Sequence, residues 1–377
     1  MNLKDLLSVM AEQNSSDLYI TVDSPPMFRT EGITKPYGDQ KITSHDAEEI
    51  ASSVMTEKQK IKFAENLEMN LALYFPDLGR FRLNIFKQKG YTGVVIRQIR
   101  TSIQTIRELK LPTILEEIGL CPRGLVLVVG RTGTGKSTTL AAMIDYRNNN
   151  ATGHIITIED PIEFVHRHKK MIVTQREIGL DTHSFESALK NVMRAAPDVI
   201  LVGEIRDLET MEAAITFAET GHLVLATLHA NNANQAMERI LNFFPHERHE
   251  QVLLQLSLNL KGIISQRLIP SADGTRAAAM EILLDTPRVK DLIHKNQVEL
   301  IKETMAQGTM EGMQTFDQAI FDLFKQGRIT YDNALIYADS VNDLRLKIKL
   351  DKIGDEKVKT TPKKMTQSTL RVRPDAK

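Results

Sequence analysis

A glycine-rich octapeptide at residues 130–137 has the residue types and the spacing that bind phosphate. It reads Gly-Arg-Thr-Gly-Thr-Gly-Lys-Ser, follows an apolar run at 125–129 and precedes a helix-like segment at 138–147. Glycines let the backbone N–H groups of such a loop turn toward phosphate oxygens, and the start of the following helix adds partial positive charge. We therefore predict a strand, a nucleotide-binding loop and a helix. The expected contacts come from Gly130, Arg131, Thr132, Gly133, Thr134, Gly135, Lys136, Ser137 and Thr138.

Two side chains of this loop have defined roles in the prediction. Lys136 would reach the β- and γ-phosphates of the nucleotide, and the Ser137 hydroxyl would be a ligand of Mg²⁺. The alternative is a glycine-rich turn that binds nothing. Eight matched positions between a strand and a helix weigh against that alternative.

Acidic residues follow a strand predicted at 154–158. Glu159, Asp160 and Glu163 surround Pro161, which ends the strand. Ligands of an open parallel sheet lie beyond the carboxyl ends of its strands, so this acidic turn should face the nucleotide. One of the carboxylates could orient or deprotonate the attacking water. A helix cap or a solvated acidic turn is the other interpretation.

Two further strands are predicted. One begins after Asp198 and ends before Glu204, and the other begins after His222 and ends before His229. By the same rule Glu204 lies near the phosphates and is the better candidate for Mg²⁺ or water, whereas Asp198 is predicted to be structural. His229 could sense the γ-phosphate, while His222 is as readily a packing or interface histidine. We do not expect zinc at these histidines, because no second ligand has zinc-like spacing.

Arginines in the first hundred residues could complete the site. Arg80 and Arg82 alternate on one predicted strand and therefore share a face, and Arg97 and Arg100 lie on a predicted partner strand. An inserted guanidinium stabilises the negative charge that spreads during phosphoryl transfer. We expect this face to dock onto a neighbouring nucleotide site, and a solvated surface is the alternative.

The elements that position these residues divide the chain into five parts. Residues 1–100 alternate strand-like and helix-like patterns, which predicts an α+β domain, and 101–122 is a linker with a short helix between two prolines. Residues 123–285 alternate short apolar strands with helices, as in a mostly parallel sheet covered on both faces. Residues 286–350 show only helical spacing. Residues 351–377 carry eight basic residues against four acidic ones and are predicted to be disordered.

Composition excludes several classes of protein. The 377 residues hold 48 Lys and Arg against 48 Asp and Glu, which argues against a general nucleic-acid-binding protein and so against a nucleic-acid translocase. The single Cys121 excludes a disulfide framework and a multi-cysteine zinc site, and it fits a reducing compartment. No apolar run approaches the roughly 20 residues that span a bilayer. The sequence predicts a cytoplasmic protein that partners recruit to any membrane at which it works.

Together the phosphate-site segments resemble the motifs of secretion-superfamily ATPases. The segments at 130–137, 156–164, 197–207 and 220–229 are similar to the Walker A, Asp box, Walker B and His box of that superfamily. More narrowly, they resemble the type IV pilus retraction ATPases of the PilT and PilU type. The resemblance extends from residue 16 to about residue 350.

Three segments resemble the PilU branch of that family. Residues 288–294 read Arg-Val-Lys-Asp-Leu-Ile-His where PilT carries Ala-Ile-Arg-Asn-Leu-Ile-Arg. Residues 194–198 and 338–345 are also similar to PilU. The resemblance therefore implies an accessory retraction motor that acts together with PilT.

The resemblance also implies a fold, an activity and partners. The expected fold is α/β, with a RecA-like P-loop ATPase core, a PAS-like N-terminal domain and a C-terminal helical segment. The expected activity is Mg²⁺-dependent ATP hydrolysis by a hexameric ring, which retracts a pilus through a PilC-type platform protein at the cytoplasmic face of the inner membrane. By resemblance, the functional side chains are the catalytic Glu163, the Walker B Glu204, the His-box pair His222 and His229, and the nucleotide-contacting Arg80, Arg82 and Arg97.

Two other functions stay open at this point. An assembly or secretion ATPase of the same superfamily would extend a pilus, but such enzymes generally carry a four-cysteine zinc module that a chain with one Cys lacks. A structural ring that couples PilT to the pilus machine would need no hydrolysis. The intact Lys136, Ser137, Glu163 and Glu204 weigh against it.

Overall fold

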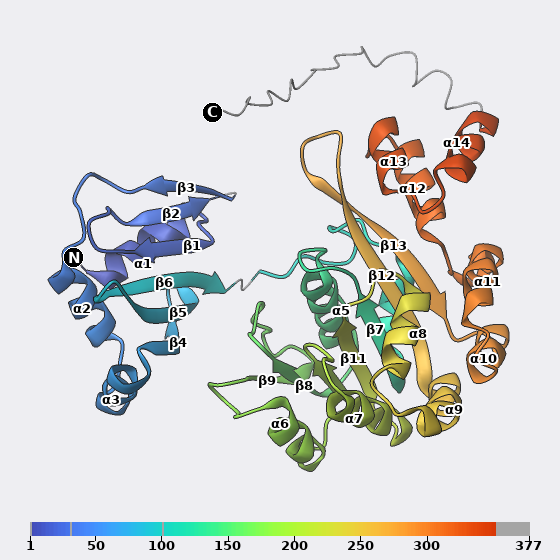
Figure 1. The fold of residues 1–377 in the computed structure, drawn as a ribbon, viewed down its shortest axis with the longest axis horizontal. Coiled ribbons are helices and arrows are strands. Elements are labelled where there is room, and N and C mark those ends of the chain that lie inside the picture. The colour runs from blue at the N-terminus through green and yellow to red at the C-terminus, as the bar shows by residue number, and fades with distance from the viewer. Residues whose placement is uncertain (1, 31, 100–101, 352–377) are drawn as a thin grey trace, which may run out of the picture.

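The computed structural model describes the chain except residues 1, 31, 100–101 and 352–377. Figure 1 shows an N-terminal sheet with its helices, a larger sheet with helices on both faces, and a group of helices at the C-terminal end. The tail predicted to be disordered lies outside the described residues from position 352 on. No helix in the described part of the chain is long and apolar enough to cross a membrane.

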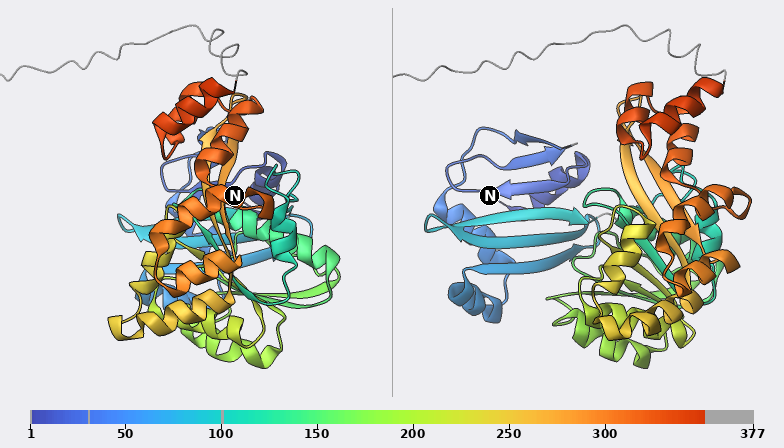
Figure 2. Two further views of the ribbon diagram at one scale, coloured as in Figure 1. Left: turned by 90° about the vertical axis from the view of Figure 1, so that its right-hand side faces the viewer. Right: turned by 45° about the vertical axis from the view of Figure 1, so that its right-hand side comes forward.

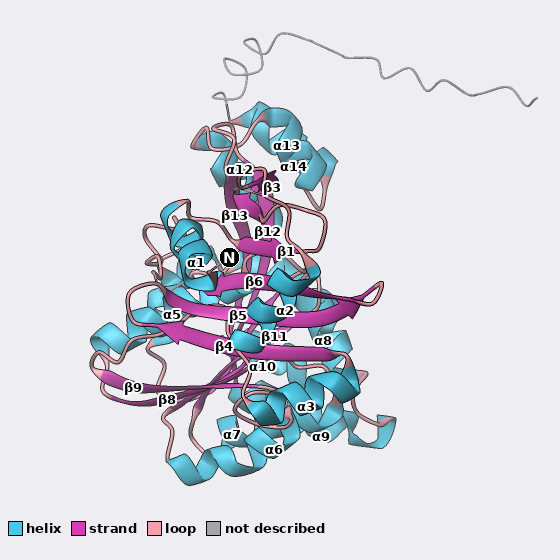
Figure 3. Cartoon of the chain, turned by 90° about the vertical axis from the view of Figure 1, so that its left-hand side faces the viewer, coloured by secondary structure: helices cyan, strands magenta, loops and turns pink. Residues whose placement is uncertain are grey.

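The N-terminal unit is a six-stranded antiparallel sheet with the order β3-β2-β1-β6-β5-β4, covered by helices (Figure 3). Its strands are β1 (Asp17–Ile20), β2 (Met27–Thr30), β3 (Ile33–Pro36), β4 (Glu68–Phe75), β5 (Gly79–Gln88) and β6 (Tyr91–Ile99). Its helices are α1 (Leu3–Glu12), α2 (Ser44–Ser53) and α3 (Glu57–Asn66). Leu3, Leu7 and Met10 lie on one face of α1 and are buried in the core of this unit. The predicted α+β character of this region is confirmed, although β2, β3 and β4 were not predicted.

A short helix occupies the linker, as the sequence predicts. α4 (Ile114–Gly119) lies between Pro112 and Pro122. Leu115 and Ile118 pack against the larger sheet together with Ile106. The linker is therefore part of the core and not a free tether.

The larger sheet has the strand order β13-β12-β7-β11-β10-β8-β9 and is parallel except for β13, which pairs antiparallel with β12. Its strands are β7 (Gly124–Val129), β8 (Gly153–Glu159), β9 (Met171–Glu177), β10 (Val199–Val202), β11 (Leu223–Leu228), β12 (Leu260–Pro270) and β13 (Arg276–Leu284). Alternate residues of β7 enter two separate apolar clusters, because both faces of the strand are covered. This confirms the predicted mostly parallel sheet.

Helices divide between the two faces of this sheet. α5 (Lys136–Asn150) and α4 cover one face, as the shared apolar cluster shows. The other face is covered by α6 (Phe185–Val192), α7 (Leu208–Glu219), α8 (Ala233–Leu241) and α9 (His249–Asn259). β7, β10 and β11 are short apolar strands whose six, four and six residues are all buried.

The C-terminal region is helical, as predicted. It comprises α10 (Pro287–His294), α11 (Ile301–Gln307), α12 (Phe316–Lys325), α13 (Tyr331–Tyr337) and α14 (Val341–Leu350). The long hairpin β12–β13 extends from the sheet to these helices (Figure 2). Ile269, Ala277 and Ala279 at its far end pack against α12, α13 and α14. The hairpin therefore joins the C-terminal helices to the sheet.

Candidate nucleotide-binding site

The glycine-rich loop connects β7 to α5 with the geometry of a phosphate-binding loop. Gly133 and Gly135 have φ angles of +79° and +88°, which favour glycine, and Gly135 is the N-cap of α5. The Lys136 Nζ donates hydrogen bonds to the carbonyl oxygens of Gly130 (2.9 Å) and Arg131 (3.2 Å). Burial lowers the pKa of Lys136, while the charges of Glu204 and Glu163 oppose that shift. The amine thus lies against the loop and within the electrostatic field of both predicted carboxylates.

A cavity of about 630 Å³ lies beside this loop. Its volume is in the range of small-molecule and cofactor sites. Phosphate-loop residues in its lining are Thr132, Gly133, Gly135, Lys136, Ser137 and Thr138. The ends of three parallel strands add Glu159, Asp160, Glu163, Glu204 and His229. The acidic turn, Glu204 and His229 therefore lie together beyond the carboxyl ends of the parallel strands, which is where ligands of such sheets bind.

The three carboxylates of the acidic turn have different environments. Glu159 accepts hydrogen bonds from Thr157 Oγ1 (2.6 Å) and Gln175 Nε2 (3.2 Å), and burial raises its pKa to about 7. Asp160 pairs with Arg206 at 3.7 Å. Glu163 is exposed in the cavity lining and makes no hydrogen bond or ion pair with other described residues. Glu163 is therefore the carboxylate of this turn best placed to receive a water molecule.

Glu204 and His229 are in direct contact. His229 Nε2 lies 2.9 Å from Glu204 Oε1, and Arg206 Nη2 lies 2.6 Å from Glu204 Oε2. At the opposite end of β10, the Asp198 carboxylate accepts a hydrogen bond from the backbone N–H of His154 (2.7 Å). The predicted division between a functional Glu204 and a structural Asp198 agrees with this placement.

Several predicted site residues do not line the cavity. His222 lies at the other end of β11, where its Nδ1 is 3.1 Å from the carbonyl oxygen of Phe217. Gly130 and Arg131 instead line a neighbouring cavity of about 330 Å³, which His229 also borders. Thr134 contacts its own loop, because its hydroxyl donates to the Arg131 carbonyl oxygen (2.8 Å).

Arg80, Arg82 and Arg97 do not line the cavity of their own chain, and Arg100 lies outside the described residues. Arg97 Nε donates to Asp17 Oδ1 within the N-terminal unit (2.8 Å), and Arg82 is its direct neighbour across β5 and β6. Arg80 Nη2 lies 3.9 Å from Glu177 Oε2 of the core. None of the three lines this cavity, so their predicted contact with nucleotide stays a prediction.

Sequence reasoning missed other residues at the site. Gln266 and Leu268 of β12, Arg276 and Ala278 of β13, Leu109 and Leu111 of the linker, Phe185 and His166 also line the cavity. Burial lowers the pKa of His166 to about 4, and its buried Nδ1 has no partner among the described residues. A signal for Gln266 existed, because Ser265, Gln266 and Arg267 interrupt an otherwise apolar segment.

The donor set of the cavity suits Mg²⁺. No three His, Cys, Asp or Glu side chains among the described residues form a group that could hold a metal ion. Mg²⁺ commonly binds through one or two protein oxygens and takes its remaining ligands from phosphate and water. The Ser137 hydroxyl and the Glu204 carboxylate both line the cavity and are oxygen donors of the required kind.

Comparison with known proteins identifies the family. The sequence profile of the family described as "Type II/IV secretion system protein" matches residues 80–320. The chain is 55% identical to the type IV pilus ATPase PilU of Pseudomonas aeruginosa, over 94% of this chain and 93% of that protein. The chain belongs to the type IV pilus retraction ATPases. It is also 42% identical to the retraction ATPase PilT of the same organism, over 89% of this chain and 97% of that protein.

A solved structure of this retraction ATPase family supports the fold. The crystal structure of the pilus retraction motor PilT with bound ADP matches with a TM-score of 0.86 and 41% identity, over 92% of this chain and 99% of that chain. The predicted RecA-like ATPase core with an N-terminal domain is confirmed. The predicted membership of the PilT and PilU family is confirmed as well.

Proposed function

We propose that this chain is the ATPase subunit of a motor that retracts type IV pili with Mg²⁺ and ATP, in concert with a PilT-type ATPase. The observation that carries the proposal is the convergence of Lys136, Glu163, Glu204 and His229 on one cavity of nucleotide size. The 55% identity to PilU over almost the whole chain points to the same pilus process.

The residues divide the chemistry among them. The loop backbone binds phosphate oxygens and Lys136 neutralises their charge, while Ser137 and Glu204 hold Mg²⁺, which supplies further positive charge when bound. Glu163 accepts a proton from the attacking water. His229 contacts Glu204 at 2.9 Å and so responds to changes at the γ-phosphate side of the site.

The motor works as a ring in this proposal. Arg80, Arg82 and Arg97 do not reach the nucleotide site of their own chain, which supports a role at the site of a neighbouring copy. His222, at the far end of β11, is proposed to act at the same kind of subunit boundary. We propose a hexamer that binds a PilC-type platform protein at the cytoplasmic face of the inner membrane. Specific nucleic-acid binding is not part of the proposal.

A retraction assay tests the proposed function. Pilus retraction and twitching are measured in cells that lack this protein, with and without the PilT-type ATPase, and after complementation with the wild type, Lys136→Ala or Glu204→Ala. We expect loss of retraction force on deletion and no rescue by either variant. Unchanged retraction in both backgrounds contradicts the proposal. Full rescue by both variants indicates a structural ring, and loss of surface pili on deletion indicates an assembly ATPase.

A further inference from the structure

A polar side chain from β12 lies at the base of the phosphate loop. Gln266 is 3% exposed and lines the nucleotide-size cavity, although β12 is otherwise largely apolar. A buried amide is costly unless its polar atoms find partners. The contacts of Gln266 therefore indicate why a polar residue occupies this position.

The Gln266 side chain holds the first turn of α5. Thr139 is 1% exposed, and its hydroxyl donates a 2.7 Å hydrogen bond to Gln266 Oε1. The two residues are 127 positions apart in the sequence. Thr139 belongs to the same helical turn as Lys136 and Ser137, so this bond fixes the helix start that presents both residues.

Gln266 also packs against both ends of the phosphate loop. A Cβ atom added at Gly130 would lie 2.7 Å from the backbone carbonyl oxygen of Gln266. A Cβ atom added at Gly135 would lie 3.0 Å from Gln266 Nε2. The absence of a side chain at these two glycines thus allows the loop to approach β12 closely.

We propose that Gln266 is a positioning residue for the phosphate site, because it holds the start of α5 and forms the surface on which the phosphate loop rests. It acts through the loop and through Thr139, and the inference rests on nucleotide binding as proposed above. The closing experiment separates the two ideas.

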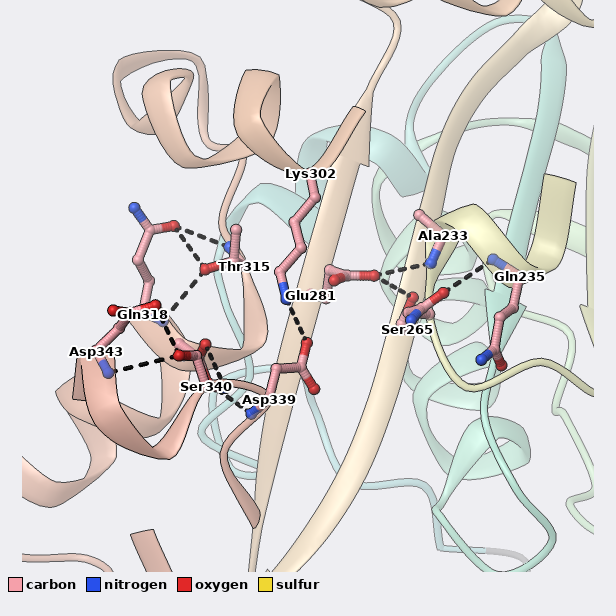
Figure 4. A network of polar contacts seen from close by, with 12 residues as sticks. Ala233, Gln235, Ser265, Glu281, Lys302, Thr315, Gln318, Asp339, Ser340 and Asp343 are labelled. Atoms are coloured by element: carbon pink, nitrogen blue, oxygen red, sulfur yellow. Dashed lines mark hydrogen bonds and ion pairs between the residues drawn. The ribbon is translucent and has the colours of Figure 1, made fainter. Parts of the chain in front are cut away.

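The opposite face of β12 is anchored independently. Ser265 Oγ donates to Glu281 Oε1 (3.0 Å), which also accepts from the backbone N–H of Ala233 at the start of α8 (2.8 Å), as Figure 4 shows. Arg267 Nη1 pairs with Asp339 Oδ1 at 2.7 Å. Successive side chains of a strand point to opposite faces, so Gln266 projects toward α5 from a strand held on its other side.

The experiment uses the full chain, four single variants, and the double variant that combines Gln266→Leu with Thr139→Val. Gln266→Leu removes the amide at similar volume, and Thr139→Val removes the partner hydroxyl, whereas Thr139→Ser keeps a hydroxyl. Gln314→Leu is the matched control, because it removes an amide that likewise makes one side-chain hydrogen bond to the same sheet but lines no described cavity. In that bond Gln314 Nε2 donates to the Met280 carbonyl oxygen (3.0 Å), whereas Gln266 Oε1 accepts from Thr139. We measure kcat and KM for ATP, the Kd for a fluorescent ADP analogue, and urea unfolding.

Gln266→Leu and Thr139→Val are each expected to weaken ADP binding about ten-fold and to lower kcat at saturating ATP, which corresponds to the loss of one buried hydrogen bond. The double variant should be about as impaired as either single variant, because both remove the same bond. Thr139→Ser should stay within about two-fold of wild type.

Two outcomes overturn the inference while wild-type ATP hydrolysis is intact. One is a Gln266→Leu protein with wild-type ADP affinity and kcat. The other is a Gln314→Leu protein that is as stable as Gln266→Leu and loses as much ADP affinity. In that case, loss of any such hydrogen bond in the sheet would weaken ADP binding. A wild-type protein that neither binds ADP nor hydrolyses ATP contradicts the proposed function instead.

Discussion

Three glutamates border one cavity and differ through their neighbours. Glu163 has no hydrogen bond or ion pair among the described residues, whereas Glu204 contacts both His229 and Arg206. Glu159 is shielded and hydrogen-bonded, with a pKa raised by burial to about 7. The same residue type therefore provides a base candidate, a paired anion and a group that titrates near neutrality.

Glu204→Gln is expected to separate hydrolysis from binding. The substitution preserves size but removes the charge that faces His229 and the proposed Mg²⁺. We expect kcat to fall by about 10² or more, in the range of lost acid–base or electrostatic catalysis, with ADP affinity within a few-fold of wild type. Steady-state phosphate release and ADP titration measure the two quantities. A kcat within two-fold of wild type would exclude a catalytic role for Glu204.

Glu159→Gln should change the pH dependence of stability. Because burial raises the folded-state pKa of Glu159 from 4.5 to about 7, wild-type stability from this group is fully present below pH 4.5 and declines as pH rises to about 7. The shift corresponds to roughly 3 kcal/mol at most. The glutamine variant lacks this loss, so its free energy of unfolding should exceed that of wild type by a growing margin up to pH 7. The free energy of unfolding of both proteins is measured by urea unfolding from pH 5 to 8. A difference between them that stays constant over this range would contradict the expectation.

At the scale of elements, the hairpin β12–β13 contacts the site from both of its faces. Gln266 points toward the phosphate loop, while Ser265 and Glu281 hold the start of α8, which follows His229 by four residues. Glu281 is 2% exposed, and burial raises its pKa. The hairpin thus fixes two of the segments that form the cavity.

Substitutions at Glu281 test this role of the hairpin. Glu281→Leu leaves the Ala233 N–H and the Ser265 hydroxyl without their acceptor, and we expect a loss of about 2–4 kcal/mol in the free energy of unfolding. Glu281→Gln keeps an acceptor oxygen and should stay close to wild type. Because the raised pKa makes the wild type lose stability as pH rises, the glutamine variant should gain relative to it at alkaline pH. If Glu281→Leu and Glu281→Gln unfold at the same urea concentration, the two hydrogen bonds that Glu281 accepts contribute little to stability.

The sequence predicted those parts of the site that lie within short segments. The loop at 130–137 and the strand ends at Glu204 and His229 follow from local pattern and from one rule of parallel sheets. The partnership of Gln266 with Thr139 could not be predicted, because the two residues are 127 positions apart and come together only through the pairing of β12 with β7. β12 and β13 themselves were missed, since three consecutive polar residues hide the strand pattern of β12.

At the scale of the whole molecule, an ion pair joins the N-terminal unit to the core. Arg80 Nη2 lies 3.9 Å from Glu177 Oε2, and that carboxylate also accepts a hydrogen bond from the backbone N–H of Ile162 (3.3 Å). Ile162 is the residue before Glu163. Burial raises the pKa of Glu177, and the charges of Arg82 and Arg80 oppose the shift. The position of the N-terminal unit is thereby linked to the acidic turn.

Arg80→Ala is expected to loosen the N-terminal unit. The Glu177 side chain is only 2% exposed, so removal of Arg80 leaves a buried carboxylate with less positive charge beside it. We expect the free energy of unfolding to fall by about 1–2 kcal/mol. Distances between spin labels on α3 and α6 should spread more widely than in wild type. Arg29→Ala is the control, because Arg29 lies 3.7 Å from the buried Asp17 within the N-terminal unit. Arg29→Ala should lower stability without broadening the distances between the spin labels. If Arg29→Ala broadens them as much as Arg80→Ala does, or if Arg80→Ala does not broaden them, this ion pair does not hold the two units together.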